Sequence, residues 1–128
     1  MKQTLLVKGI GNDIIEIDRI RKTIDKYGHQ FYNKILTVGE LEYCLSHKNP
    51  APPIASRFSA KEAIAKALGT GFGKKVSFLD IEILHDELGR PFPEFTDSLN
   101  NYFNTPHLLI SMSHCKEYAT AVALWLED

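Results

Sequence analysis

Residues 54–68, IASRFSAKEAIAKAL, form the longest uninterrupted helical pattern in the sequence. The stretch is rich in alanine and other good helix formers, contains no glycine or proline, and stops at Gly69. Ala63, Ala65 and Ala67 leave little side-chain bulk on this helix, so a ligand or another chain could approach its surface closely. We therefore expect a long helix over 54–68 whose small residues are open to a neighbour.

The segment before this helix combines a short strand with a first, shorter helix. Thr4–Ile10 is apolar enough for a strand, and Gly9 and Gly11 bracket its end, where we expect the backbone to turn. Asp13 is expected to open a helix that ends at Gly28. Apolar residues recur every three or four positions along it, as on one buried helix face: Ile14, Ile17, Ile20, Ile24 and Tyr27.

Two shorter helical patterns and a proline cluster separate this first helix from the long one. The patterns cover residues 31–36 and 38–46, and Thr37 with Glu40 forms a Thr-x-x-Glu capping box for the second. Residues 49–53 contain three prolines. We expect this cluster to break the chain before the long helix begins.

The C-terminal half alternates turns with extended segments. We expect strands over 76–84 and 91–95, joined by a hairpin turn at 86–89, and then a short helix over 97–103. Two further strands, over 108–114 and 118–126, make an antiparallel pair. Helices that mostly precede strands, with one strand at the start, favour an α+β fold in which helices pack on an antiparallel sheet.

Length and composition favour a single domain over residues 1–128. The chain has 128 residues, 44% hydrophobic and 24% charged, so it can bury a core without disulfides or a structural metal. The longest strongly apolar stretch, 118–126, is too short to span a membrane, and the N-terminus lacks the apolar core of a signal peptide. We expect a cytoplasmic protein in which Cys44 and Cys115 are ordinary thiols.

The net charge of −1 conceals two basic segments. Residues 18–34 carry +3 and residues 57–75 carry +4, which leaves −8 for the rest of the chain. Such segregation can concentrate a positive field on one face, which suits a phosphate ligand or an acidic partner, although two solvated helix faces would give the same count. A sequence pI near 6.5 and the lack of a basic stripe interleaved with aromatics argue against nucleic-acid binding.

Familiar catalytic motifs are mostly missing, since there is no Gly-x-Ser-x-Gly elbow, Walker loop, His-Glu-x-x-His or dinucleotide fingerprint. Two carboxylates stand out instead. Asp13 with Glu16 fits a helix N-cap, a role that needs no catalysis. Glu62 with Lys66 fits an ordinary i,i+4 helix pair, but the small residues around it would hold this carboxylate in position.

Two long motifs in the same order resemble one family. The first is GIGNDIIEIDRI over 9–20, the second is RFSAKEAIAKALGTG over 57–71, and SMSH at 111–114 with EYA at 117–119 follows. Together they closely resemble the holo-acyl-carrier-protein synthases, the small 4'-phosphopantetheinyl transferases, over nearly the whole chain. The resemblance implies transfer of the phosphopantetheine arm of coenzyme A to a serine of apo acyl carrier protein. It also implies release of adenosine 3',5'-bisphosphate and a role in fatty acid and lipid biosynthesis.

The resemblance further implies a metal-dependent site. Asp13 and Glu62 match the family's metal ligands, and two carboxylates with phosphate oxygens and water suit Mg²⁺, with Mn²⁺ as an alternative. Lys66, one turn after Glu62, would neutralise charge on the pyrophosphate. Either Glu62 or a metal-held water would accept the serine proton, and the sequence leaves both alternatives open. The nucleophile would then belong to the substrate protein.

Contacts to coenzyme A follow from the same resemblance. Arg57 and His114 match positions near the nucleotide phosphates, and the Gly-Thr-Gly turn would let the backbone come close to the ligand. Because His114 shares strand parity with Met112, a hydrogen-bonded core histidine is an equal alternative. The histidines without a motif, expected at the surface, are His29, His47, His85 and His107. The implied coenzyme A ligands are Arg57, Lys66, Gly69, Thr70, Gly71 and His114.

A basic helix face suggests how a partner binds. If the apolar side of the first helix packs inward, Arg19, Lys22 and Lys26 are exposed at helical spacing. Acyl carrier proteins are acidic and helical, so this face resembles the family's docking surface, although the adjoining Asp18 weakens its charge. A non-catalytic oligomeric module that binds an acidic helical partner through this helix is the alternative from a different function class.

Family members of this length are homotrimers with sites between subunits, and the resemblance extends that expectation to this chain. The C-terminal residues 122–126 are strongly apolar. A subunit interface would explain them, and a central core strand would explain them equally well.

Overall fold

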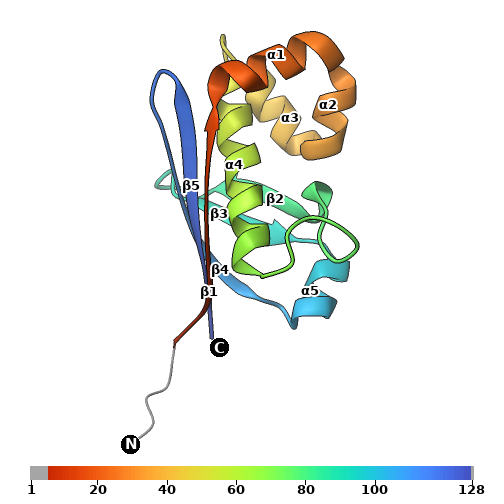
Figure 1. Ribbon diagram of the computed structural model, residues 1–128, viewed down its shortest axis with the longest axis vertical. Helices are drawn as coiled ribbons and strands as arrows, with labels where there is room; N and C mark the ends of the chain where they lie inside the picture. The colour runs from red at the N-terminus through yellow and green to blue at the C-terminus, as the bar shows by residue number, and fades with distance from the viewer. Residues whose placement is uncertain (1–5, 128) are drawn as a thin grey trace, which may run out of the picture.

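The computed structural model describes residues 6–127, and Figure 1 shows how the helices and strands are arranged. Within these residues no helix is both long and apolar enough to cross a membrane. The elements in chain order are β1 (Val7–Glu16), α1 (Ile17–Tyr27), α2 (His29–Ile35), α3 (Val38–Leu45), α4 (Ala51–Ala67), the 3₁₀ turn η1 (Phe78–Asp80), β2 (Ile81–His85), β3 (Pro91–Phe95), α5 (Asp97–Phe103), β4 (His107–His114) and β5 (Tyr118–Leu126).

The strands of residues 6–127 form two antiparallel sheets. One has the order β1-β5-β4, with the last strand at its centre, and the other is the β2-β3 hairpin. α4 lies along one face of the three-stranded sheet and contacts all three of its strands (Figure 1). α1, α2 and α3 gather around one end of α4, and α5 lies near the other. The predicted α+β fold, with helices packed on an antiparallel sheet, is confirmed.

Gly9 and Gly11 lie inside β1 and not at a turn, because this strand passes directly over α4. A Cβ atom on Gly9 would lie 2.0 Å from the carbonyl oxygen of Ala67, and one on Gly11 would lie 2.0 Å from that of Ala63. Real Cβ atoms do not approach oxygen so closely, so a side chain at either position would push the strand off the helix. The two glycines therefore serve close packing.

The first helix consequently begins later than its sequence pattern predicts. β1 continues to Glu16, so the predicted end of the strand near Ile10 is wrong, and residues 4 and 5 of the predicted strand lie outside the described residues. Asp13 lies within the strand, so the prediction that it caps a helix is also wrong. The buried face of α1 includes Ile17 and Ile20, whereas Ile14 and Tyr27 are exposed.

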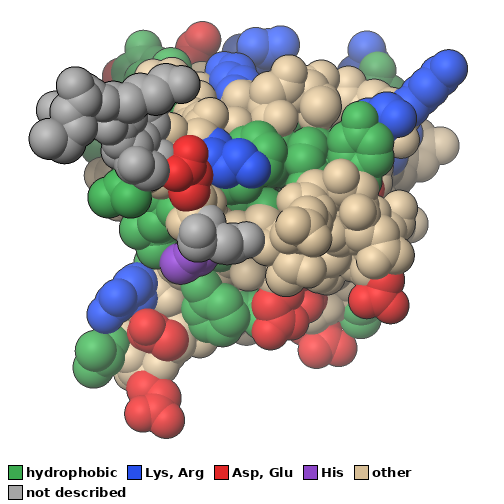
Figure 2. All heavy atoms as spheres, turned by 90° about the horizontal axis from the view of Figure 1, so that it is seen from below, with side chains coloured by type: hydrophobic (Ala, Val, Ile, Leu, Met, Phe, Trp, Pro, Cys, Tyr) green, Lys and Arg blue, Asp and Glu red, His purple; other side chains and the backbone are tan. Residues whose placement is uncertain are grey.

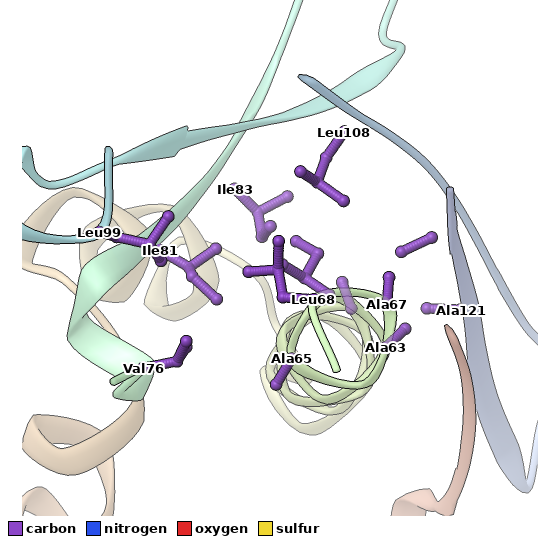
Figure 3. Packing of buried hydrophobic residues seen from close by; sticks show 13 residues of the cluster. Ala63, Ala65, Ala67, Leu68, Val76, Ile81, Ile83, Leu99, Leu108 and Ala121 are labelled. Atoms are coloured by element: carbon purple, nitrogen blue, oxygen red, sulfur yellow. The ribbon is translucent and has the colours of Figure 1, made fainter. Parts of the chain in front are cut away.

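The small residues of α4 are buried within the protein's own core. Ala63, Ala65 and Ala67 are at most 3% exposed. They belong to the same hydrophobic core as Ala121 and Ala123 of β5, part of which Figure 3 shows. Ala63 and Ala67 face the strand that carries Ala121, whereas Ala65 is buried on the other side of the helix (Figure 3). The same chain covers both sides, so the prediction of a helix surface open to a ligand or another chain is wrong.

Local signals set the starts of α3 and α4. The predicted capping box is confirmed: the Glu40 amide donates to the Thr37 hydroxyl at 3.2 Å, and the Thr37 amide donates to the Glu40 carboxylate at 2.9 Å. α4 begins at Ala51, with Pro52 and Pro53 in its first turn. Proline is tolerated there because first-turn amides have no helical acceptor, so the proline cluster starts the helix and does not break the chain.

Most predictions for the C-terminal half are confirmed. β2 begins at Ile81 and not at Val76, because Phe78–Asp80 first forms η1. The β2-β3 hairpin, α5 and the antiparallel β4-β5 pair lie where the sequence predicts them. β5 pairs with β1 on one edge and with β4 on the other, so it is a central strand.

A fully buried ion pair joins α4 to the elements around it. Lys61 and Glu40 have 0% side-chain exposure, and their charged groups are 2.6 Å apart. The Lys61 ammonium also donates to the carbonyls of Ile35 at 2.6 Å and Phe78 at 3.1 Å. The second Glu40 oxygen accepts from the amide of Ile83 at 2.9 Å. The pair thus connects α4 with the end of α2, α3, η1 and β2.

The face of the three-stranded sheet turned away from α4 is open, since no helix of residues 6–127 covers it (Figure 1). The strand register aligns Ile10, Leu124 and Leu109 across this face. Ile10 is 67% exposed and Leu109 is 52% exposed. Figure 2 views the molecule from below and shows hydrophobic side chains among charged ones at that end. The outer sheet face is therefore accessible to another chain.

Candidate active site

Asp13 is anchored through its backbone by two neighbouring elements. Its carbonyl oxygen accepts hydrogen bonds from the hydroxyls of Ser59 at 3.1 Å and Thr120 at 2.8 Å. Its carboxylate is 16% exposed and lies 3.2 Å from the ammonium of Lys66 on α4. Lys66 also donates to the carbonyl of Asn12 at 3.0 Å. β1 is thereby tied to α4 at the residue that carries the carboxylate.

Glu62 lines the same cleft as Asp13. Partial burial raises the pKa of Glu62, the negative charge of Asp13 raises it further, and the charge of Lys66 opposes both effects. A like charge shifts a carboxyl pKa only when the two groups are near one another. The structure therefore brings together the two acids that the sequence analysis singled out, from β1 and from α4.

The cleft that holds the two acids lies between β1, α1, α2 and α4 and has a volume of about 320 Å³. This is the size of a small ligand-binding site. Arg19 of α1 lines it beside the carboxylates, and much of the remaining wall is apolar, including Phe31 and Phe58. The sequence analysis did not predict the role of these two aromatic residues, because they come from different helices and only folding brings them to one wall.

The two carboxylates fit a hard divalent cation. The described residues contain no group of three or more His, Cys, Asp or Glu side chains arranged to hold a metal. Mg²⁺ needs no such group, because it keeps several waters and is commonly bound by one or two carboxylates together with substrate phosphates. Asp13 and Glu62 offer oxygen donors in one cleft. Burial is the main cause of the raised pKa of Glu62 and the negative charge of Asp13 is the second, and a cation bound there would relieve the repulsion between the two carboxylates.

Arg57 and His114 line a second pocket, formed by the end of α3, the first turns of α4, and the ends of β2 and β4. Arg57 is only 3% exposed. His114 is exposed at the end of β4, so the alternative of a buried core histidine is wrong. His47 and His85, expected as ordinary surface residues, line this pocket too. No motif marks these two histidines, and the sequence carries no signal that would have found them.

The glycine-rich turn is remote from that pocket within one chain. Gly69 and Gly71 follow α4 with φ angles of 84° and 61°, which glycine adopts readily. The Thr70 hydroxyl donates to the Gly71 carbonyl at 3.0 Å. Arg57 lies near the other end of α4, roughly 18 Å away along the helix axis. Within a single chain the expected coenzyme A residues therefore lie in three separate places. Arg57 and His114 share one pocket, Lys66 lies beside β1, and the turn at 69–71 follows α4.

The basic face of α1 is exposed as predicted. Arg19, Lys22 and Lys26 are all exposed on this helix, and Arg19 reaches the cleft of the two acids. Lys22 forms a 3.1 Å ion pair with Asp18, and this contact is the main reason that the pKa of Asp18 is lowered. The pair is solvent-exposed and constrains Lys22 only weakly. Positive groups thus extend along α1 to the rim of the cleft.

The fold and the cleft define a class of protein. Residues 9–123 match the family model described as the 4'-phosphopantetheinyl transferase superfamily. Comparison with curated proteins narrows this class. The chain is 55% identical over 117 residues to the holo-[acyl-carrier-protein] synthase of Protochlamydia amoebophila, with 91% of this chain and 96% of that protein covered. It is 51% identical over 118 residues to that of Chlamydia muridarum, with 91% and 92% covered.

Solved structures agree with these matches. The holo-[acyl-carrier-protein] synthase from Neisseria meningitidis superposes with a TM-score of 0.90 at 35% identity, covering 95% of this chain and all of that one. The synthase from Bacillus anthracis, solved in complex with CoA (3',5'-ADP), gives 0.84 at 39% identity, covering 97% and 100%. The chain belongs to the holo-[acyl-carrier-protein] synthases, enzymes of the phosphopantetheinyl transferase class.

Proposed function

We propose that this protein transfers the 4'-phosphopantetheine arm of coenzyme A to a serine hydroxyl of apo acyl carrier protein, with Mg²⁺ bound and adenosine 3',5'-bisphosphate released. The observation that carries the proposal is the cleft in which Asp13, Glu62 and Arg19 meet. Relatives of this chain solved with coenzyme A or its nucleotide part support the choice of donor. The reaction would serve fatty acid and lipid biosynthesis.

Asp13 and Glu62 are the residues that would hold Mg²⁺, with Mn²⁺ as an alternative. When bound, the cation would supply charge neutralisation as the leaving group gains negative charge. The ammonium of Lys66 lies 3.2 Å from the carboxylate of Asp13, which places a positive charge beside the same cleft. Lys66 would therefore stabilise negative charge on the bound pyrophosphate.

The reaction forms one bond and breaks another. The serine oxygen of the carrier bonds to the phosphorus attached to pantetheine, and the bond from that phosphorus to the bridging pyrophosphate oxygen breaks. The serine proton must leave, and either Glu62 or a water held by the cation would accept it. The enzyme contributes position and charge and needs no nucleophile of its own.

The basic face of α1 is our proposed docking surface for the carrier. Arg19, Lys22 and Lys26 are exposed, and Arg19 lies where the helix meets the cleft. An acidic helical partner bound there would bring its serine toward Asp13 and Glu62. Attraction between exposed charges weakens as salt is added, so this docking should be sensitive to ionic strength.

We assign coenzyme A binding to Arg57, His114, Lys66 and the turn at residues 69–71, and we propose that copies of the chain combine to complete the site. These groups lie on different sides of α4 in one chain. The open sheet face with Ile10, Leu109 and Leu124 supplies an apolar surface for association. A homotrimer with sites between subunits, each built from one domain over residues 1–128, accounts for both observations.

Mass spectrometry of the carrier protein tests the function. Apo carrier protein incubated with this enzyme, coenzyme A and Mg²⁺ should gain about 340 Da, the mass of the phosphopantetheine arm, on one serine. A reaction without added enzyme is the control. A carrier that binds the enzyme but gains no mass would contradict the proposal. That result would favour the alternative function, a non-catalytic module that binds acidic helical partners.

A further inference from the structure

The turn after α4 continues into a glycine-rich loop, residues 69–75, with the sequence GTGFGKK. Every second residue from 69 to 73 is glycine, which loses more conformational freedom on ordering than any other residue. A Cβ atom on any of these glycines would have no atom of residues 6–127 within 4 Å beyond its own chain neighbours. The glycines therefore do not pack against the body of the protein, and a side chain of the loop must hold it in place.

Phe72 is the large apolar side chain of this loop, and its ring stacks on Phe78 of η1. The two ring centroids are 3.9 Å apart and the ring planes differ by 17°. Phe78 stacks in turn on Phe58 of α4 at 5.3 Å, and the ring of Phe31 on α2 follows at 6.5 Å. Phe31 and Phe58 line the cleft of the two acids. A row of aromatic rings therefore connects the glycine-rich loop to the wall of that cleft.

Phe78 is held firmly in place, whereas the loop is not. The carbonyl of Phe78 accepts a hydrogen bond from the buried ammonium of Lys61 at 3.1 Å. The η1 turn is closed by a capping box in which the Ser77 amide donates to the Asp80 carboxylate at 2.9 Å. Phe72 packs against the core between α4 and the sheets, and Phe78 packs against a second core among α1, α2, α3 and α4. Their stack joins the loop to a rigid part of the fold.

The other attachments of the loop are weak. The Gly71 amide donates to the carbonyl of Ala65 at 3.2 Å, and the Thr70 hydroxyl bonds within the loop itself. The ammonium of Lys75 lies 4.4 Å from the ring centroid of Tyr102, but both side chains are exposed, and exposed cation–π contacts contribute little. The stack of Phe72 is therefore the contact that decides whether the loop is ordered.

We propose that Phe72 is a positioning residue for coenzyme A, because its stack on Phe78 orders residues 69–75 before the ligand binds. The inference rests on the proposed function, which assigns the turn at residues 69–71 to coenzyme A. Ordering a glycine-rich loop costs conformational entropy, and a contact that orders it in the free protein removes this cost from ligand binding. The role of Phe72 belongs to affinity for coenzyme A and not to the chemical step.

Limited digestion with trypsin measures the order of the loop without ligand or reaction. Trypsin cleaves after lysine, and Lys74 and Lys75 are exposed within the loop. Phe72→Leu keeps apolar volume but removes the flat ring, so cleavage at these lysines should be about tenfold faster than in the wild type. Cleavage at Lys116, exposed in the β4-β5 turn, is the internal reference and should not change. An unchanged rate at Lys74 and Lys75 would overturn the ordering role.

Binding and kinetics separate positioning from simple core packing. Phe72→Leu should raise the Kd and KM for coenzyme A about tenfold and leave kcat and the KM for carrier protein unchanged. Phe72→Tyr keeps the ring and should bind coenzyme A as the wild type does. Equal increases in both KM values, or a Phe72→Tyr variant as weak as Phe72→Leu, would show that Phe72 only supports the fold.

Phe103→Leu is the matched control for lost stability. Phe103 packs against the same core as Phe72, and its ring meets that of Trp125 edge-on at 5.9 Å. This variant should lower the unfolding midpoint about as much as Phe72→Leu does, without changing the Kd for coenzyme A or cleavage in the loop. An increase in Kd as large as that of Phe72→Leu would attribute the effect to stability and overturn the proposal.

Removal of the partner ring tests whether the stack is the cause. Phe78→Leu should raise the Kd for coenzyme A as Phe72→Leu does, and the double variant should bind little worse than either single variant, because both changes remove one contact. Additive losses in the double variant would show that the two rings act separately.

The two proposals fail in different ways. Digestion by trypsin and titration with coenzyme A alone report on the loop even if transfer is never seen. Absence of phosphopantetheine transfer by the wild-type enzyme would contradict the proposed function, whereas normal transfer with unaltered coenzyme A affinity in Phe72→Leu would contradict only the positioning role.

Discussion

Lys61 and Glu62 are consecutive residues of α4, yet one lies in a closed charge network and the other in an open cleft. The ammonium of Lys61 is fully buried and donates to three acceptors, one of them the carboxylate of Glu40 at 2.6 Å. Glu62 is partly exposed beside Asp13, and within residues 6–127 no ion pair engages its carboxylate. Adjacent charges on one helix thus have opposite surroundings.

The pKa shifts express the same contrast. Burial lowers the pKa of Lys61, and the opposite charge of Glu40 offsets this by favouring the charged form. Burial raises the pKa of Glu62, and the like charge of Asp13 adds to the effect. A buried charge with a structural role has a partner that balances it. A carboxylate held beside another carboxylate keeps its oxygens for a ligand, which is what a catalytic site requires.

Replacing Glu62 should have the largest effect on activity. Glu62→Gln keeps the shape of the side chain and removes its charge, so we expect kcat/KM to fall at least about a thousandfold, or about 4 kcal/mol, with the fold intact. The measurement is the rate of carrier modification by mass spectrometry. Glu87→Gln, an exposed acid in the β2-β3 turn, is the control and should remain active. Near-normal activity in Glu62→Gln would end the assignment of this residue to the site.

Replacing Lys61 should instead act on stability. Lys61→Met leaves the Glu40 carboxylate buried without its cation, so we expect the free energy of unfolding to fall by about 3 kcal/mol. Urea unfolding followed by circular dichroism measures it. The double variant with Glu40→Gln should lose less than the sum of the two single changes, because both remove one interaction. A loss below about 1 kcal/mol in Lys61→Met would show that the pair is not structurally important.

Arg19 is a third kind of charge, exposed to solvent and proposed to contact the carrier protein. Arg19→Ala should raise the KM for carrier protein about tenfold, or about 1.4 kcal/mol, and leave the KM for coenzyme A nearly unchanged. The effect should shrink as salt is added, because the contact is between exposed charges. Arg90→Ala, on the β2-β3 turn, is a matched control. Equal increases in both KM values would contradict a docking role for Arg19.

The smallest expected effect concerns the stability of Glu62→Gln. Because the folded state raises the pKa of Glu62 above its ordinary value of 4.5, the folded protein holds this proton more tightly than the unfolded chain does. The contribution of Glu62 to stability therefore falls as pH rises from 4.5 through the raised pKa, and it stays lower above that range. Glu62→Gln should unfold at slightly higher urea than the wild type at neutral pH, with the difference vanishing in acid. A lower midpoint at neutral pH would contradict this.

The sequence predicted elements with local signals better than those that depend on long-range packing. The capping box at Thr37 and the β4-β5 pair depend on local signals, and both are confirmed. Gly9 and Gly11 resemble turn residues because a sequence does not show what packs against them. Glycine is required at both positions because the carbonyl oxygens of α4 lie directly against the strand, and this contact exists only in the folded chain.

The site was predicted mainly through the family resemblance. Local patterns around Asp13 and Glu62 indicated a helix cap and a helix pair, and the structure shows instead a strand residue that shares a cleft with a helix residue. The aromatic and histidine groups of the second pocket, such as Tyr43 and His85, come from α3 and β2. No spacing along the chain relates them, so they could not be predicted without the structure.

The most direct test of the account is whether Asp13 and Glu62 bind one cation together. Crystals soaked with coenzyme A and Mn²⁺ allow the metal to be located by its anomalous scattering. We predict one peak in the cleft, bound by both carboxylates and by phosphate oxygens of the ligand. Coenzyme A bound in the crystal with a metal peak that neither carboxylate touches would contradict the central claim.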